Sequence, residues 1–262
     1  MKRLICLLFL LPASTAAAHD TWVETNTSVV RTGDAVYVDL KLGNHGNEHR
    51  DFKLASKIDL ADCTLEVITP DGDSYDLLPS LVDVGYAPKE GYYTGKYVAA
   101  AEGVYAVAHA LDTVVNHGRP VRSVKSGKTY FLAGKSLDQV PFGLPGFDRA
   151  LGHALELVPV ANPVAPMGPG QPISVKAIFK GSPLAGARVS FIPRSGELTE
   201  GFDDRYERMT DEDGLASFTP KTGDRYLVVV HHRTDESGEG YGETAYSATL
   251  TVLVPELCPC CE

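Results

Sequence analysis

The chain has 262 residues and a formal net charge of −10 at pH 7. This length is enough for two modest domains. The acidic balance argues against nucleic acid and anionic lipid as partners, because both would repel a negatively charged surface.

The first eighteen residues have the pattern of a secretory signal. Residues 1–3 are a basic start, residues 4–11 are an apolar run too short to span a bilayer, and residues 16–18 are three alanines that suit a cleavage site. We therefore expect residues 1–18 to be a cleaved signal peptide and the mature protein to be periplasmic or secreted. Loss of the cations Lys2 and Arg3 would take the net charge from −10 to −12. No later segment reaches about 18 consecutive apolar residues, so we expect no membrane span in the mature chain.

Cleavage after Ala18 would make His19 the first residue of the mature protein. The α-amine and the imidazole of a terminal histidine can chelate one metal ion in a ring, as in the histidine-brace copper sites of some secreted oxidases. An imidazole is mostly unprotonated at neutral pH, and a bound metal displaces the proton of the amine. Two more imidazoles from the fold would complete a site suited to copper, nickel or zinc. The alternative is that His19 is only a frayed terminus.

Apolar and polar residues alternate along several stretches, which predicts half-buried strands. The clearest stretches are residues 36–42, 105–111, 173–179 and 246–254. Glycine-containing turns separate such stretches at residues 32–34, 70–72 and 213–214, where a positive φ suits glycine. No stretch with a helical period has a convincing length. The sequence therefore predicts an all-β fold of two consecutive β-sandwich domains, Ig-like or prealbumin-like in kind.

Proline and glycine cluster at residues 140–153, and we place the domain boundary there. The predicted division is a signal peptide at 1–18, an N-terminal β-sandwich domain at 19–148 and a C-terminal prealbumin-like domain at 149–255. Residues 155–159 are the expected opening strand of the second domain, and the proline-rich run 161–172 is a loop inside it. The cysteine-rich tail, 256–262, is too short to fold alone.

Three further histidines join His19 in the predicted metal site. His45 closely follows the strand that ends near residue 42, within the stretch "GNHGNEHR", whereas His49 in the same stretch is better explained as a solvated turn residue. His109 lies on one face of the strand at 105–111, where a hydrogen-bonded core role is the alternative. His117 lies eight residues later in a turn.

The remaining histidines are weaker candidates. His231 and His232 end a strand and point to opposite faces, so at most one of them can face a given site. His153 lies near the domain junction and can face either domain.

Four cysteines follow the signal peptide, which permits two disulfides in an oxidising compartment. They are Cys63, Cys258, Cys260 and Cys261. The last three are close enough in sequence to bind a soft ion such as Cu(I) or Zn(II) if they stay reduced. Adjacent cysteines pair only with strain, so one of them can instead reach Cys63. The sequence leaves two alternatives: a disulfide that involves these cysteines, or a metal site formed by their thiolates.

Several stretches together resemble a family of exported proteins of unknown function, the NikM-like or nickel-uptake-associated proteins. The stretches are "AHDTWV", "YAPKEGYYTGKYV", "AHALDTVVNHGRPVRSVKSGKTYFLAG", "LELVPVANP", "FKGSPLAGARV" and "TDEDGLASFTPKTGDRYLVVVHH". The resemblance covers almost the whole mature chain. It implies handling of nickel or cobalt outside the cytoplasm. The second half separately resembles the prealbumin-like modules of exported bacterial proteins, which are usually scaffolds.

These observations favour an exported binding protein for a divalent transition metal, nickel, cobalt or copper, that serves uptake or handling and catalyses no reaction. Its partners would be the metal ion and an envelope transport component. One alternative is a non-catalytic envelope interaction or structural module, and the other is a histidine-brace copper oxidase. Common enzyme motifs are absent: there is no Gly-x-Ser-x-Gly and no His-Glu-x-x-His. "SGKT" at 126–129 is not a phosphate-binding loop, because Arg122 replaces the upstream glycine and a strand follows.

Overall fold

A computed structural model describes residues 19–43, 59–85, 87, 90–116, 118–137 and 143–256. Regular structure in these ranges consists of strands and two short 3-10 helices, η2 (Leu60–Asp62) and η3 (Leu78–Ser80). The described part of the chain contains no helix of the length and apolarity that crossing a membrane requires. The strands are β1 (Asp20–Thr25), β2 (Val29–Arg31), β3 (Ala35–Gly43), β4 (Cys63–Ile68), β5 (Ser74–Asp76), β6 (Val82–Asp83), β7 (Tyr93–Val98), β8 (Gly103–Asn116), β9 (Pro120–Gly134), β10 (Leu155–Pro159), β11 (Ile173–Phe179), β12 (Ser182–Pro183), β13 (Arg188–Pro193), β14 (Glu207–Met209), β15 (Leu215–Phe218), β16 (Asp224–Thr234) and β17 (Thr244–Val254). The predicted all-β sandwich fold is confirmed.

The alternating stretches form strands as predicted. β11 has the predicted bounds 173–179, and β3, β8 and β17 contain the other three stretches. The turn glycines Gly33, Gly72 and Gly214 have φ values of 91°, 92° and 77°, in the region that side chains other than glycine rarely adopt. The residues of "SGKT" lie inside β9, which confirms that they form no phosphate-binding loop.

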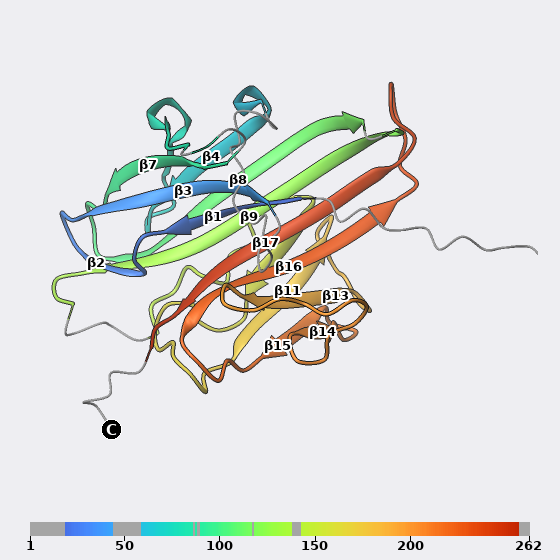
Figure 1. Cartoon of the computed structure of the whole chain (residues 1–262). Helices are drawn as coiled ribbons and strands as arrows, with labels where there is room; N and C mark the ends of the chain where they lie inside the picture. The colour runs from blue at the N-terminus through green and yellow to red at the C-terminus, as the bar shows by residue number, and fades with distance from the viewer. Residues whose placement is uncertain are drawn as a thin grey trace, which may run out of the picture.

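The strands form one sheet of nine and two sheets of four. The large sheet has the order β14-β13-β16-β17-β9-β8-β4-β5, and β2 also pairs with β9. Its long strands β8, β9, β17 and β16 run side by side (Figure 1). The small sheets have the orders β1-β3-β7-β6 and β10-β11-β12, with β15 pairing β11. Most pairs are antiparallel, but β17 and β2 are parallel to β9.

The β17–β9 pair joins strands from both sides of the predicted domain boundary. Residues 244–251 of β17 pair in register with residues 122–129 of β9. The division into 19–148 and 149–255 stays a prediction, but the backbone hydrogen bonds of one sheet continue across it. Residues 1–18, His45, His49, His117 and residues 257–262 lie outside the described residues.

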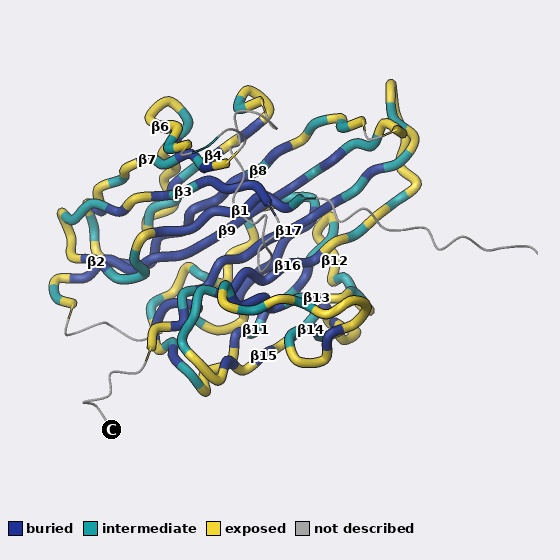
Figure 2. The backbone as a smooth tube through the Cα atoms, viewed as in Figure 1, coloured by how far each residue is buried: buried dark blue, intermediate teal, exposed yellow. Residues whose placement is uncertain are grey.

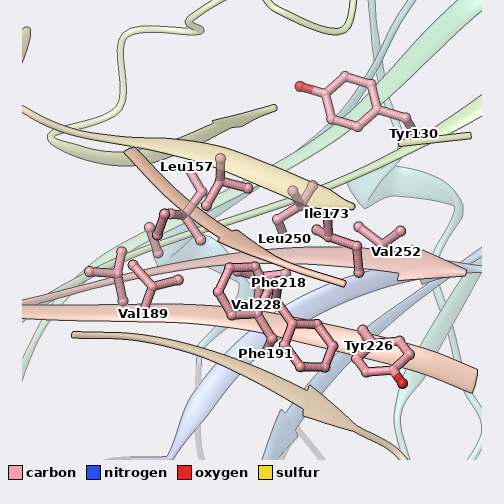
Figure 3. Close-up of a cluster of buried hydrophobic side chains, with 14 of the residues drawn as sticks. Tyr130, Leu157, Ile173, Val189, Phe191, Phe218, Tyr226, Val228, Leu250 and Val252 are labelled. Carbon is pink, nitrogen blue, oxygen red and sulfur yellow. The ribbon is translucent and has the colours of Figure 1, made fainter. Parts of the chain in front are cut away.

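Two hydrophobic cores lie on opposite faces of the large sheet. Alternate residues of β8 and β9 enter different cores, because successive side chains of a strand point to opposite faces. In the first core, Tyr105 and Phe131 pack with β3 and β7 of the first small sheet. In the second core, Ala106 and Tyr130 pack with the strands of the second small sheet. Figure 2 shows the long central strands as mostly buried, with exposed residues at turns and edges. Figure 3 shows part of the second core, in which Phe191 and Phe218 lie with their ring centroids 5.4 Å apart.

Candidate metal site at the start of the first strand

The strand that follows the predicted cleavage site is held against the large sheet. β1 is the edge strand of the first small sheet, and its Trp22 is completely buried. Trp22 packs in a small cluster with Ile192 of β13 and with two residues of β16, Leu227 and Val229. The strand that begins one residue after His19 is therefore a fixed part of the fold.

Polar contacts fix the backbone at both ends of β1. The Thr249 hydroxyl donates to the Thr21 carbonyl at 2.9 Å, and the ammonium of Lys125 donates to the carbonyl of His19. At the other end, the buried carboxylate of Glu24 accepts from Lys41 at 2.5 Å and from Arg194 at 2.6 Å. These contacts join β1 to Lys41 of β3 and to Arg194, which directly follows β13.

Asp20 binds the imidazole of His231, which lies on β16. The Nε2 of His231 and the Oδ1 of Asp20 are 2.9 Å apart. The Asp20 side chain is only 13% exposed, whereas the His231 side chain is 55% exposed. The negative charge of Asp20 raises the pKa of His231 above its usual value. Burial alone would raise the pKa of Asp20, but the charge and hydrogen bond of His231 hold that pKa below its usual value.

This arrangement is typical of the surroundings of metal-binding histidines. Such a histidine commonly gives one ring N–H to a carboxylate, which fixes the ring and makes the other nitrogen a better donor. With Nε2 of His231 bound to Asp20, Nδ1 is the nitrogen left to bind a metal. His19 directly precedes Asp20 in the chain. The donor set of nitrogens suits copper, nickel and zinc.

His109 has a structural role in the first core. It is 1% exposed, its Nδ1 lies 2.9 Å from the Thr64 carbonyl, and its Nε2 lies 3.1 Å from the Thr21 hydroxyl. A carbonyl only accepts, so Nδ1 carries the proton and Nε2 accepts from Thr21. Burial lowers the pKa of His109 to about 4, so the ring is neutral at pH 7. Metal binding through Nε2 would first have to break the hydrogen bond to Thr21.

The other residues considered as metal ligands lie at different places in the structure. His232 packs edge-on against Phe179, with ring centroids 4.5 Å apart, while His231 faces Asp20; this confirms the prediction that the two rings point to opposite faces. His153 lines a cavity together with Lys125, Ser126 and Leu155. No group of three or more His, Cys, Asp or Glu side chains within the described ranges is placed to hold a metal ion. Cys63 is buried on β4, and no disulfide joins it to another described residue.

The sequence did not identify Asp20 or Lys125 as parts of the site. Asp20 precedes His231 by 211 positions, so no local spacing links them. The position of Asp20 directly after a candidate terminal histidine was the available signal. For Lys125 there was none, since alternation predicts only the face of a strand and not its contacts.

A family model described as a domain of unknown function (DUF4198) matches residues 16–234 of the chain. No curated protein matches it by sequence. Among solved structures, a DUF4785 family protein from Legionella pneumophila is similar at 14% identity and a TM-score of 0.30, over 79% of this chain and 52% of that one. A trypsin-activated alpha-2-macroglobulin from Escherichia coli matches at 14% identity and a TM-score of 0.25, over 91% of this chain and 16% of that one. The D00-D0 domain of intimin matches at 12% identity and a TM-score of 0.21, over 90% of this chain and 100% of that one. The chain thus spans about half of the first structure and a small part of the second.

Proposed function

The chain belongs to the DUF4198 family, whose function is unknown, and from that premise we propose that it is an exported, non-catalytic binding protein for a divalent transition metal, nickel, cobalt or copper. The anchor of the site is the mature N-terminal His19, which supplies its amine and its imidazole. His231 supplies a further imidazole through Nδ1. His45 and His117, outside the described residues, are candidates for the remaining ligands.

One observation carries this proposal: the hydrogen bond between Asp20 and His231 directly beside residue 19. It supports a fixed imidazole, still half exposed, next to the position where cleavage would create a free amine. The contact of Lys125 with the carbonyl of His19 also argues against a frayed terminus. The positive charge of Lys125 does not prevent a cation from binding nearby, since Lys125 also interacts with the negative charge of Asp20.

In this role the protein would capture or pass on an ion outside the cytoplasm. A chelating amine and imidazole pair gives affinity without a reaction step, and an edge position leaves the ion accessible to a second protein. An envelope transport component is the partner that this role requires. The acidic surface, with a net charge of −10 for the whole chain, attracts cations in general.

The test requires protein exported with its own signal, so that His19 is truly the first residue. Mass spectrometry of the secreted product gives the N-terminus, and calorimetry with Ni²⁺, Co²⁺ and Cu²⁺ gives stoichiometry and affinity. We expect one ion per chain and strong loss of binding in His19→Ala. We expect about 10- to 100-fold weaker binding in His231→Ala and in Asp20→Asn, since removal of an orienting carboxylate has effects of that order.

His232→Ala is the matched control, because it removes the adjacent imidazole on the other face of the same strand. It should bind metal as the unmodified protein does. A second control carries one extra residue before His19, which converts the amine to an amide and should abolish tight binding. A different first residue, or metal binding that His19→Ala leaves unchanged, would refute the proposal. Absence of any stoichiometric ion would favour an envelope interaction module, and turnover of a reductant with oxygen by the copper-loaded protein would favour an oxidase.

A further inference from the structure

Arg188 of β13 is the cross-strand neighbour of His231 on the large sheet. In the β13–β16 pair Val189 is opposite Val230, so the register brings Arg188 opposite His231. Val189 and Val230 point into the second core, and the residues next to them therefore point to the other face, where Asp20 contacts His231. Side chains opposite each other on antiparallel strands begin about 5 Å apart. Arg188 is therefore placed beside the imidazole of the proposed metal site.

The guanidinium of Arg188 is held from one side. Its Nη1 donates to the Gly201 carbonyl at 2.9 Å and lies 3.7 Å from the carboxylate of Glu207. Within the described ranges, no acceptor is hydrogen-bonded to its Nε or Nη2. The Arg188 side chain is 52% exposed, whereas that of Glu207 is 4% exposed. Arg188 thus keeps N–H donors available to a ligand while one hydrogen bond holds the group in place.

The charges around His231 balance without a metal ion. The charged side chains with the largest effect on the pKa of its ring are Asp20, Lys125 and Arg188. Lys125 offsets the negative charge of Asp20. The carboxylate of Glu207 offsets Arg188. A divalent ion would add two positive charges that none of these groups compensates, and charge in a partly buried site is costly unless it is paired.

An anion bound together with the ion would supply the missing negative charge. The amine and imidazoles of the proposed site are neutral donors, so a carboxylate can occupy a further position on a transition metal. A guanidinium binds carboxylate oxygens through two parallel N–H bonds. Because Arg188 lies one strand away from His231, at a spacing of about 4.8 Å, the anion has to reach across the gap between two strands. Two carboxylates joined by a short chain suit this geometry.

We propose that the site takes its ion as a complex with a small organic dicarboxylate, with one carboxylate on the metal and the other on the N–H groups of Arg188. This inference rests on the proposed function and names its substrate class. His19 and His231 provide affinity for the ion, and Arg188 provides preference for an anionic complex over the bare cation.

Malonate tests the proposal, because it carries two carboxylates on one carbon. The exported protein, with His19 as its first residue, is loaded with Ni²⁺ and titrated with malonate in a calorimeter. We expect one malonate per bound ion, and much weaker binding of malonate to the metal-free protein. Arg188→Gln should bind malonate about 10- to 100-fold more weakly, the size of charge-assisted hydrogen bonds. Its affinity for Ni²⁺ alone should not fall, since the variant loses a positive charge.

Arg233→Gln is the matched control. Arg233 lies two positions after His231 on the same face of β16, is 56% exposed and pairs with Glu243 at 2.9 Å. It should leave malonate binding unchanged. Arg188→Lys keeps the charge but loses the planar fork, so it should weaken malonate binding less than Arg188→Gln does. With Cu²⁺ in place of Ni²⁺, malonate should shift the visible absorption of the copper, and Arg188→Gln should need more malonate for the same shift.

Failure of this proposal can be told apart from failure of the proposed function. No Ni²⁺ binding by the unmodified protein would overturn both. Tight Ni²⁺ binding without binding of malonate would overturn only the proposal made here, as would equal malonate affinity of the unmodified protein and Arg188→Gln. An equal loss in Arg233→Gln would mean general attraction of anions and would also overturn it. If Arg188→Gln fails to fold, Arg188→Lys decides, with Arg233→Lys as its control.

Discussion

The ion pair of Lys128 with Glu156 allows a quantitative test of how the two halves of the chain hold together. Lys128 lies on β9 and Glu156 on β10, their charged atoms are 2.6 Å apart, and their side chains are 2% and 1% exposed. Glu156 also accepts from the backbone N–H groups of Leu151 and Gly152 at 2.6 and 3.1 Å. Lys128→Met removes the cation but keeps most of its volume, so the carboxylate of Glu156 loses its only ion-pair partner among the described residues.

The expected loss of unfolding free energy for Lys128→Met is about 3 to 5 kcal/mol at pH 7, because an uncompensated charge stays buried. For a chain of this size that is a drop of about 6 to 20 °C in Tm. Burial alone would raise the pKa of Glu156, but Lys128 and the hydrogen bonds hold it below its usual value. Its stabilising contribution is therefore present above the unfolded pKa and is lost as the pH falls through the folded pKa.

Without Lys128 the pKa shift of Glu156 changes direction. Burial then raises the pKa of Glu156, so the deficit of Lys128→Met is largest at neutral pH and shrinks in acid, where the carboxyl takes up a proton. The double variant Lys128→Met with Glu156→Leu should recover most of the stability, since apolar replacement of a buried pair is often neutral. Urea unfolding followed by circular dichroism at pH 7 and pH 5 measures both effects.

The surface pair of Lys135 and Glu102, 3.4 Å apart and 86% and 48% exposed, is the control. Lys135→Met should cost less than about 1 kcal/mol. A loss of that small size for Lys128→Met at pH 7 would refute the reasoning.

Three further outcomes are expected. Gly127→Ala should destabilise the protein by about 1 to 3 kcal/mol in urea unfolding, because its Cβ would lie 2.9 Å from the Thr249 hydroxyl; an unchanged midpoint would contradict the close packing of the Thr249 side chain of β17 against β9. Asp20→Asn should lower the pKa of His231 in an NMR titration. Because the folded pKa of His231 is raised, its contribution to stability is present at low pH and lost as the pH rises through that pKa, so Asp20→Asn should cost less above it. Cys63 should resist alkylation in the reduced native protein, since burial raises its pKa to about 11; rapid labelling of its peptide, read by mass spectrometry, would contradict this.

Local patterns predicted the strands well. Residues 173–179 were assigned to a strand from alternation alone, and β11 has those bounds. Glycine was expected in turns with positive φ, and Gly33 and Gly214 have that geometry. Strand alternation and turn glycines depend only on a few neighbouring residues, so they can be recognised without knowledge of the rest of the fold. The proline-rich run 161–172 was likewise expected to be a loop, and it contains no strand.

The residues of the candidate site were harder to predict from local sequence patterns. His109 was grouped with His19, with a hydrogen-bonded core role as the alternative, and the structure gives His109 two hydrogen bonds within the first core. His231 was a weaker candidate than His45; the structure binds the His231 ring to Asp20, whereas His45 lies outside the described residues. A histidine in a sequence does not reveal whether its ring nitrogens are engaged, because the partners are usually backbone and hydroxyl groups of distant strands.

The sequence by itself determined that this chain folds as strands, where most of those strands lie and which turns separate them, because alternation and turn chemistry are local properties. Only the tertiary structure decided that β9 pairs in parallel with β17, more than a hundred residues away, and that Asp20 meets His231. Contacts of that separation depend on how whole sheets pack and twist, and no short stretch of residues encodes them. The contact of Asp20 with His231, one residue after His19, follows from that packing.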